Sequence, residues 1–249
     1  MPYIESICKA GKTIEVERYY TARFGCRGQR RSQKVKPTPE EQKKINDRLA
    51  EKKLRRLINE NFTEGDYHLV LSYKRDKGEP YREAEDMKED IRKFLRTLRR
   101  EYKIRGQDLK YIHVSETGQR GARHHHLIIN EIPPAVIQKC WPHGRIHVNP
   151  LDRTGNYRDL AAYLVKQTSK AIKTEEELQG KRWNSSKNLR HPEPEKRIIT
   201  ERAWYRSEAR VPAKYKGKYV IDPDSISIGV TSPEYYGYGY IRFTMVMLC

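Results

Sequence analysis

The chain has 249 residues, and its 51 lysines and arginines exceed its 33 aspartates and glutamates by 18. This positive charge is spread along the chain, which favours a polyanionic partner, most simply a nucleic acid, over a basic protein without such a partner. The four cysteines are isolated from one another, so neither a zinc ribbon nor a disulfide framework is expected. No apolar run has the length of a membrane span, and no signal peptide is visible at the start. We therefore expect a cytoplasmic protein that does not contact a membrane.

Residues 1–61 form a predicted basic N-terminal extension. Residues 3–8 and 12–20 are prone to form strands, with an Ala-Gly turn between them, and so predict a hairpin. The stretch 23–36 contains six basic residues and no acidic one, and is either an arm that follows a phosphate backbone or a solvated loop. Proline and glutamate residues after Thr38 then predict a surface helix that ends near residue 61.

The remaining pattern alternates between strand and helix periods. The predicted elements are a strand at 67–73, a helix at 82–103, strands at 111–116 and from 123, a helix at 133–141, a strand at 144–148 and a helix at 156–170. This order predicts an α+β fold, in which a mostly antiparallel sheet carries helices on one face, as in ferredoxin-like and RRM-like domains. We expect the principal domain to span residues 62–208. The tyrosine-rich segment 209–249 could stack bases, but a terminal strand packed on that domain is the favoured interpretation.

Three consecutive histidines begin the second strand of a predicted hairpin. Because side chains alternate along a strand, His124 and His126 share one face and His125 takes the other. Glu116 closes the preceding strand, beside the point where the histidines begin. Two imidazoles and one carboxylate, with further coordination positions left open, are typical of a catalytic metal site. The alternative is a histidine cluster that faces water.

A second motif lies on the predicted helix 156–170. Leu160, Leu164 and neighbouring apolar residues form its packing stripe, and Tyr163 lies with Lys166 on the opposite side. An ammonium group three residues from a phenol favours the phenolate, so we expect a lowered tyrosine pKa and a nucleophilic side chain. A tyrosine and a lysine at this spacing also occur by chance in basic helices.

A basic, polar loop follows this helix and contains one aromatic residue, Trp183. It either lines a DNA channel or is an ordinary surface loop. The predicted DNA-binding residues are Arg123, Lys170, Lys181, Arg182, Trp183 and Lys187.

The motifs are short, but their order is specific. A strand ending in Tyr73, Glu116 before a loop, the paired histidines on a strand, and Tyr163-x-x-Lys166 on a helix together resemble the HUH endonucleases. The closest similarity is to the rolling-circle replication initiators of plasmids and phages, over roughly residues 62–208. The resemblance implies an HUH nuclease fold and the nicking and rejoining of single-stranded DNA at a replication origin, which can be a hairpin. A host helicase and polymerase are the implied partners.

The resemblance also assigns roles to residues. The divalent-metal ligands correspond to His124 and His126, with Glu116 as the third, and Tyr163 corresponds to the nucleophile that leaves a 5′-phosphotyrosyl enzyme. Lys166 corresponds to the lysine of the tyrosine motif and would steady the phenolate or the phosphate. Imidazole with carboxylate suits Mn²⁺ and is tolerated by Mg²⁺.

The sequence departs from the family pattern in three respects. His125 stands where the family usually has an apolar residue, the motif has one tyrosine rather than two, and no G-x-x-x-x-G-K-[ST] segment of a helicase is present. The chain is therefore expected to nick DNA without unwinding it. A relaxase or a single-strand transposase of the same superfamily remains an alternative. A non-catalytic RRM-like binding module is a more distant one, because the aromatic pattern of such modules is missing.

Overall fold

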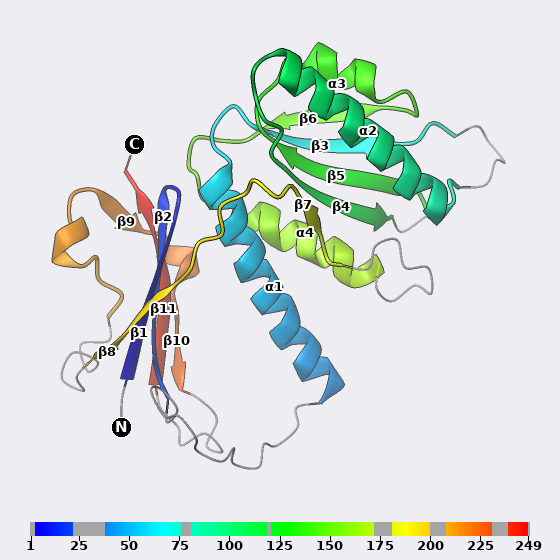
Figure 1. Cartoon of the computed structure of the whole chain (residues 1–249). Helices are drawn as coiled ribbons and strands as arrows, with labels where there is room; N and C mark the ends of the chain where they lie inside the picture. The colour runs from blue at the N-terminus through cyan, green and yellow to red at the C-terminus, as the bar shows by residue number, and fades with distance from the viewer. Residues whose placement is uncertain are drawn as a thin grey trace. The chain divides into compact units, whose positions relative to one another are not determined.

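The computed structural model describes residues 3–21, 38–75, 81–118, 121–171, 181–199, 208–230 and 239–248, with the side chains of 169–171 excepted (Figure 1). The predicted basic arm 23–36 lies outside these residues. The chain divides into two compact units. The central unit comprises Lys43–Arg153 and Tyr157–Arg190, and the terminal unit comprises Met1–Gln42, Thr154–Asn156 and His191–Cys249. These boundaries differ from those predicted at residues 61 and 208.

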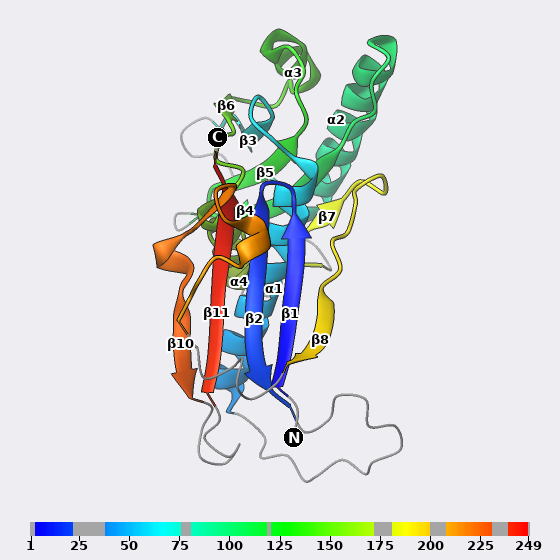
Figure 2. The ribbon, with the colours of Figure 1, turned by 90° about the vertical axis from the view of Figure 1, so that its left-hand side faces the viewer.

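The terminal unit is built around an antiparallel sheet with the strand order β10-β11-β2-β1-β8 (Figure 2). The predicted N-terminal hairpin is confirmed as β1 (Tyr3–Ala10) and β2 (Thr13–Tyr20). Their turn contains Gly11 at φ +53°, a left-handed conformation that glycine adopts without strain. The other elements are β8 (Glu195–Ile199), β9 (Tyr219–Ile221), β10 (Ser227–Val230) and β11 (Gly239–Met247), with 3₁₀ turns at Ala213–Tyr215 and Pro223–Ser225.

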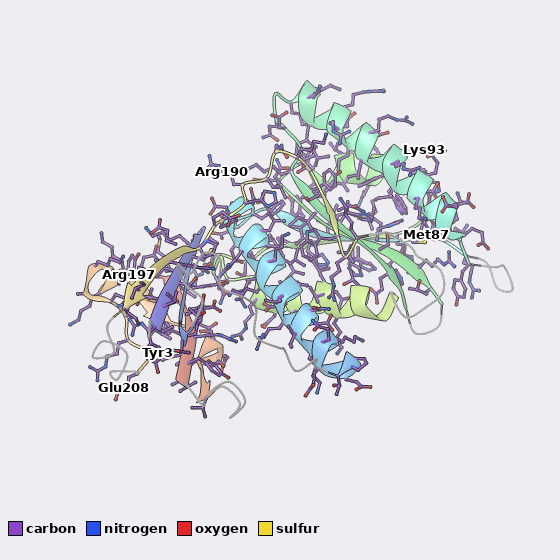
Figure 3. The ribbon with its side chains drawn as sticks, turned by 60° about the horizontal axis from the view of Figure 1, so that its bottom comes forward. Tyr3, Met87, Lys93, Arg190, Arg197 and Glu208 are labelled. Atoms are coloured by element: carbon purple, nitrogen blue, oxygen red, sulfur yellow. The ribbon has the colours of Figure 1, made fainter. Side chains whose placement is uncertain are left out.

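Long-range pairing explains why the unit boundaries differ from the prediction. β11 pairs along β2, and β8 pairs along β1, so strands from both ends of the chain complete one sheet. On one face of this sheet the buried carboxylate of Glu5 accepts hydrogen bonds from Arg18 Nε at 2.8 Å and Arg197 Nε at 2.7 Å. Figure 3 shows Arg197 and Tyr3 on the paired strands β8 and β1. Hydrophobic periodicity reports which residues are buried but not their partners, and so could not reveal this unit.

The central unit contains a five-stranded antiparallel sheet of order β6-β3-β5-β4-β7. Its strands are β3 (Tyr67–Ser72), β4 (Tyr111–Thr117), β5 (Arg123–Ile129), β6 (Ile146–Pro150) and β7 (Asn184–Ser185). Its helices are α1 (Pro39–Asn61, whose first turn belongs to the terminal unit), α2 (Ala84–Ile104), α3 (Pro134–Cys140) and α4 (Arg158–Ala171). The predicted α+β class is confirmed. None of the described helices is long and apolar enough to cross a membrane.

Helices cover both faces of this sheet, whereas the sequence predicted helices on one face only. Ile128 of β5 packs in a core with α1 and α4, whereas Leu127 and Ile129 pack in a second core with α2 and α3. All three side chains are fully buried. A continuous apolar run such as this one is typical of a strand that is covered on both sides.

Candidate metal and tyrosine site

Strand β5 presents its histidines to opposite helix layers. His124 pairs with Glu116 on β4 and with Ser72 on β3, while His126 pairs with Val114 and Val70. These residues share the face that carries Ile128 and the α4 layer. His125 lies on the other face, with the α2 layer.

The carboxylate of Glu116 and the ring of His126 are in direct contact. Glu116 Oε2 lies 2.6 Å from His126 Nε2, and the side chains are 13% and 3% exposed respectively. The other nitrogen of the ring, Nδ1, lies 3.3 Å from Nε2 of His68, a residue of β3. Burial first, and then His126, lower the pKa of His68 to about 4, so His68 is uncharged at neutral pH. His126 therefore bridges a carboxylate and a neutral imidazole.

Sequence reasoning missed His68, because its strand was considered only as an element that ends in Tyr73. The residue is one position before Leu69, and its relation to His126 depends on the pairing of β3 with β5. A histidine beside the apolar residues of this strand was the available signal.

Helix α4 brings Tyr163 to the same group. The centre of its ring lies 5.4 Å from that of His126 and 6.4 Å from that of His68, and both contacts are edge-on. Tyr163 is 41% exposed, so its side chain borders the buried site and reaches solvent. The structure thus brings together Tyr163, His126, Glu116 and His68.

The predicted lowering of the Tyr163 pKa is wrong for this arrangement. Partial burial first, and then the charge of Glu116, raise this pKa, while a hydrogen bond with the Gln167 side chain lowers it only in part. Gln167 is one turn further along α4 and is buried, whereas Lys166 is exposed. The carboxylate facing the phenol, which lies on another element, therefore has more effect than the nearby lysine on the same helix.

The site offers the donors of a divalent-metal centre, but they do not converge on one point. Among the described residues, no three His, Cys, Asp or Glu side chains are arranged to hold an ion. Two ligands at right angles, with bonds of about 2.1 Å, lie about 3 Å apart, whereas the Glu116 and His126 atoms form a 2.6 Å hydrogen bond. An ion would have to replace that hydrogen bond. Two imidazoles and a carboxylate fit Mn²⁺, and tolerate Mg²⁺, in their chemistry.

On the opposite face, His125 belongs to a buried polar chain. Its Nε2 lies 2.8 Å from the hydroxyl of Tyr73, and its Nδ1 lies 3.0 Å from Nε2 of His113. Ser115 Oγ lies 3.4 Å from each of the two rings. His125 is fully buried, and its pKa is well below the usual value because of burial and then the neighbouring His113. The residue that departs from the family pattern is therefore an uncharged, hydrogen-bonded part of the interior.

The buried polar chain of side chains continues from Tyr73 to Asp90, near the start of α2. The Asp90 carboxylate interacts with Tyr73, and burial and then Asp90 raise the Tyr73 pKa far above its usual value. Asp90 in turn accepts hydrogen bonds from Arg82 at 2.9 and 3.2 Å and lies 3.4 Å from His143 Nε2. The ring of Tyr73 also packs edge-on against Trp141, with 5.2 Å between the ring centres. These contacts tie the strand of the histidines to α2.

The predicted DNA-binding residues lie in different surroundings. Arg123 and His124 line a cavity of about 670 Å³, together with Tyr73, Arg75 and Tyr81. Arg182 is ion-paired at 2.6 Å with Asp47 of α1, and Trp183 is half-buried against the core beneath α1 and α4. Lys181 and Lys187 are exposed, and the Lys170 side chain lies outside the described atoms. Trp183 thus contributes to packing, which a single aromatic residue in a polar loop did not reveal.

Tyr163 lies beside His126, His68 and Glu116 on an antiparallel sheet covered by helices, whereas the resemblance to HUH replication initiators pairs His126 with His124. Residues 66–171 match the family model of the replication-associated protein ORF2/G2P. The match runs from the start of β3 to the end of α4 and so includes each motif, although it covers less than half of the chain. It confirms the predicted resemblance to replication initiators and indicates a role in replication. No curated protein and no solved structure gave a match.

Proposed function

We propose that the protein nicks and rejoins single-stranded DNA at a replication origin, through a covalent tyrosine intermediate, and so initiates rolling-circle replication. The observation that carries this proposal is the position of Tyr163, a partly exposed phenol against the buried group formed by His126, Glu116 and His68. A tyrosine that served packing alone would be buried, whereas the Tyr163 side chain is 41% exposed and can reach a bound DNA strand.

The proposed reaction is an in-line displacement at phosphorus. The Tyr163 oxygen forms a bond to the scissile phosphorus, the bond to the 3′ oxygen breaks, and the products are a 5′-phosphotyrosyl enzyme and a free 3′-hydroxyl. The Gln167 side chain holds the phenol by its hydrogen bond. Attack by a 3′-hydroxyl on the phosphotyrosine reverses the reaction and rejoins the strand. A host polymerase would extend the 3′-hydroxyl, while a host helicase opens the duplex.

A divalent cation, Mn²⁺ or Mg²⁺, held by His124, His126 and Glu116 would supply Lewis-acid stabilisation of the charge on the scissile phosphate. The chain's own contribution is to hold these donors. His126 is fixed between Glu116 and His68, and the pairing of β4 with β5 sets Glu116 opposite His124. Lys166, exposed one turn from Tyr163, is proposed to attract the phosphate.

The test is a cleavage assay on single-stranded origin DNA with Mn²⁺. The wild-type protein should form an adduct that survives denaturation, and mass spectrometry should place the nucleotide on Tyr163. Tyr163→Phe should lose the adduct and lower cleavage by orders of magnitude, because the nucleophilic oxygen is removed. Tyr157→Phe is the control on the same chain segment. Tyr157 is buried and donates a hydrogen bond to the Asp152 carbonyl at 3.0 Å, so its variant should lose some stability but keep the adduct.

Three outcomes would change the assignment. An adduct on Tyr157 or on a C-terminal tyrosine would place the nucleophile elsewhere. Cleavage by Tyr163→Phe without any adduct would mean that water is the nucleophile and that the protein is a hydrolytic nuclease. Tight DNA binding without cleavage under any metal would favour the non-catalytic RRM-like module. A relaxase or a single-strand transposase would form the same adduct and would differ in the DNA sequence that it recognises.

A further inference from the structure

Helix α2 carries a row of cations on its outer face. Its buried residues are Met87, Asp90, Ile91, Phe94, Leu98 and Tyr102. At about 100° per residue, Arg96, Arg99, Arg100 and Lys103 fall within an arc of about 100° on the opposite side. All four are exposed. We call these four residues the α2 stripe; Figure 3 shows the outer side of this helix, with Lys93 labelled one turn earlier.

The α2 stripe differs from the rest of the helix in being free of counter-charges. In the first half of α2, Lys88 pairs with Glu85 at 2.6 Å, and Arg92 and Lys93 each lie 3.7 Å from Glu89. In the second half, the acidic residue Glu101 pairs with Arg105 at 2.7 Å. Within the part of the chain that the structure describes, no carboxylate pairs with any residue of the α2 stripe. Four adjacent uncompensated cations on a rigid helix repel one another, an arrangement that a polyanion relieves.

The chemistry of the surface fits a double-stranded rather than a single-stranded nucleic acid. Proteins that bind single strands combine cations with exposed aromatic rings on which bases stack. The aromatic residues of α2, Phe94 and Tyr102, are both buried, so the outer face offers only contacts to phosphates. The α2 stripe rises about 10 Å along the helix, at 1.5 Å per residue. That length matches about three phosphates of one strand of a duplex, spaced about 3.4 Å apart along its axis.

The α2 stripe is also separate from the candidate site. Within the central unit, α2 packs on the sheet face that carries Leu69, Leu71 and Leu127, and α4 packs on the face that carries Val114 and Ile128. Tyr163 lies on α4, so the sheet separates it from the α2 stripe. A single-stranded segment bound at Tyr163 would have to pass around the sheet to reach α2. The α2 stripe is therefore suited to a different stretch of nucleic acid.

We propose that the α2 stripe is a second nucleic-acid surface, which binds the phosphate backbone of duplex DNA without sequence preference. It goes beyond the proposed nicking reaction, because duplex binding there requires neither metal nor tyrosine. Its effect would be to hold the protein on the double-stranded DNA beside a single-stranded origin.

The test compares two variants of the full chain, each with four cations changed to glutamine. The first changes Arg96, Arg99, Arg100 and Lys103. The control changes four exposed lysines of the terminal unit, Lys9, Lys196, Lys216 and Lys218, and so removes the same net charge. Binding of a 30-base-pair DNA duplex of arbitrary sequence, of a poly(dT) strand and of a duplex RNA is measured by fluorescence anisotropy against salt, without divalent metal.

Each phosphate contact contributes about 0.9 to the slope of log affinity against log salt on duplex DNA. On duplex DNA, the magnitude of this slope should therefore be smaller by about 3 to 4 in the stripe variant than in the wild type. The poly(dT) binding of the stripe variant and the duplex binding of the control should change little. An equal loss in the control would mean that net charge alone governs binding, and would overturn the proposal. An equal loss on poly(dT) would assign the α2 stripe to the single-strand path. Tighter wild-type binding of duplex RNA, lost in the stripe variant, would assign it to RNA. None of these binding measurements depends on cleavage, so their outcome can be distinguished from a failure of the nicking proposal.

Discussion

The polar chain behind the histidine strand gives the sharpest test of how the site is held. Tyr73→Phe removes one hydroxyl and keeps the ring that packs on Trp141. The hydroxyl lies 2.8 Å from Nε2 of His125, a side chain with no exposed surface. The variant therefore removes the partner of a buried imidazole nitrogen.

Leaving a buried polar group without its hydrogen bond costs about 1–3 kcal/mol. We expect Tyr73→Phe to lower the free energy of unfolding of the central unit by about 2 kcal/mol, a fall of about 4–8 °C in Tm for a chain of this size. Tyr67→Phe, at the start of β3, the strand that ends directly before Tyr73, is the matched control. Among the described residues the Tyr67 hydroxyl has no hydrogen-bond partner, so its loss should cost less than about 0.5 kcal/mol.

The measurement is chemical denaturation monitored by tryptophan fluorescence, because Trp141 packs on Tyr73. A double-mutant cycle of Tyr73→Phe with His125→Leu should give a coupling energy of at least about 0.5 kcal/mol, since the two residues are in contact. Equal losses for Tyr73→Phe and Tyr67→Phe, with no coupling to His125, would refute the inference that the polar chain holds the strand.

The remaining predictions concern the metal, the tyrosine and the terminal unit. EDTA should abolish cleavage, and added Mn²⁺ should restore it; cleavage that resists chelation would remove the metal from the mechanism. His126→Ala should abolish cleavage while most single-strand affinity survives, because binding rests on phosphate contacts and stacking; equal loss of both, seen in parallel cleavage and anisotropy assays, would mean that His126 serves only the fold. Glu116→Gln should lower the Tyr163 pKa, which Glu116 raises after burial; ultraviolet titration of the phenolate, with Tyr163→Phe as the blank, would show no such shift if Glu116 were remote in solution. Burial raises the Glu5 pKa, but the hydrogen bonds from Arg18 and Arg197 outweigh it, so the folded-state pKa is below its ordinary value. A carboxylate with a lowered pKa stabilises the fold above its unfolded-state pKa, and this contribution is lost as the pH falls through the folded-state value. The free energy of unfolding should therefore fall less in Glu5→Gln than in the wild type as the pH decreases from 6 to 3. An unchanged pH dependence in denaturation experiments would contradict this reasoning.

The local elements and the motifs could be predicted from the amino-acid sequence alone. Alternation on a strand is a property of the backbone, so the opposite faces of His125 and His126 followed from their adjacency. The helical period located α2 and α4, and the Ala-Gly turn located the first hairpin. The order of the motifs predicted the resemblance to replication initiators, which the family match over residues 66–171 confirmed.

The contacts of these residues depend on how the strands and helices pack. The pairing of β3 with β5 put His68 beside His126, and α4 carried Tyr163 close enough to Glu116 for that carboxylate to raise its pKa. The pairing of strands from the two ends of the chain made the terminal unit, and the position of β5 between β3 and β4 put His125 beside Tyr73 and His113. The physical reason is common to all four cases. Propensity and period act within a few residues, whereas electrostatic interactions and hydrogen bonds depend on distances between residues far apart in the chain, which only the packed sheet sets.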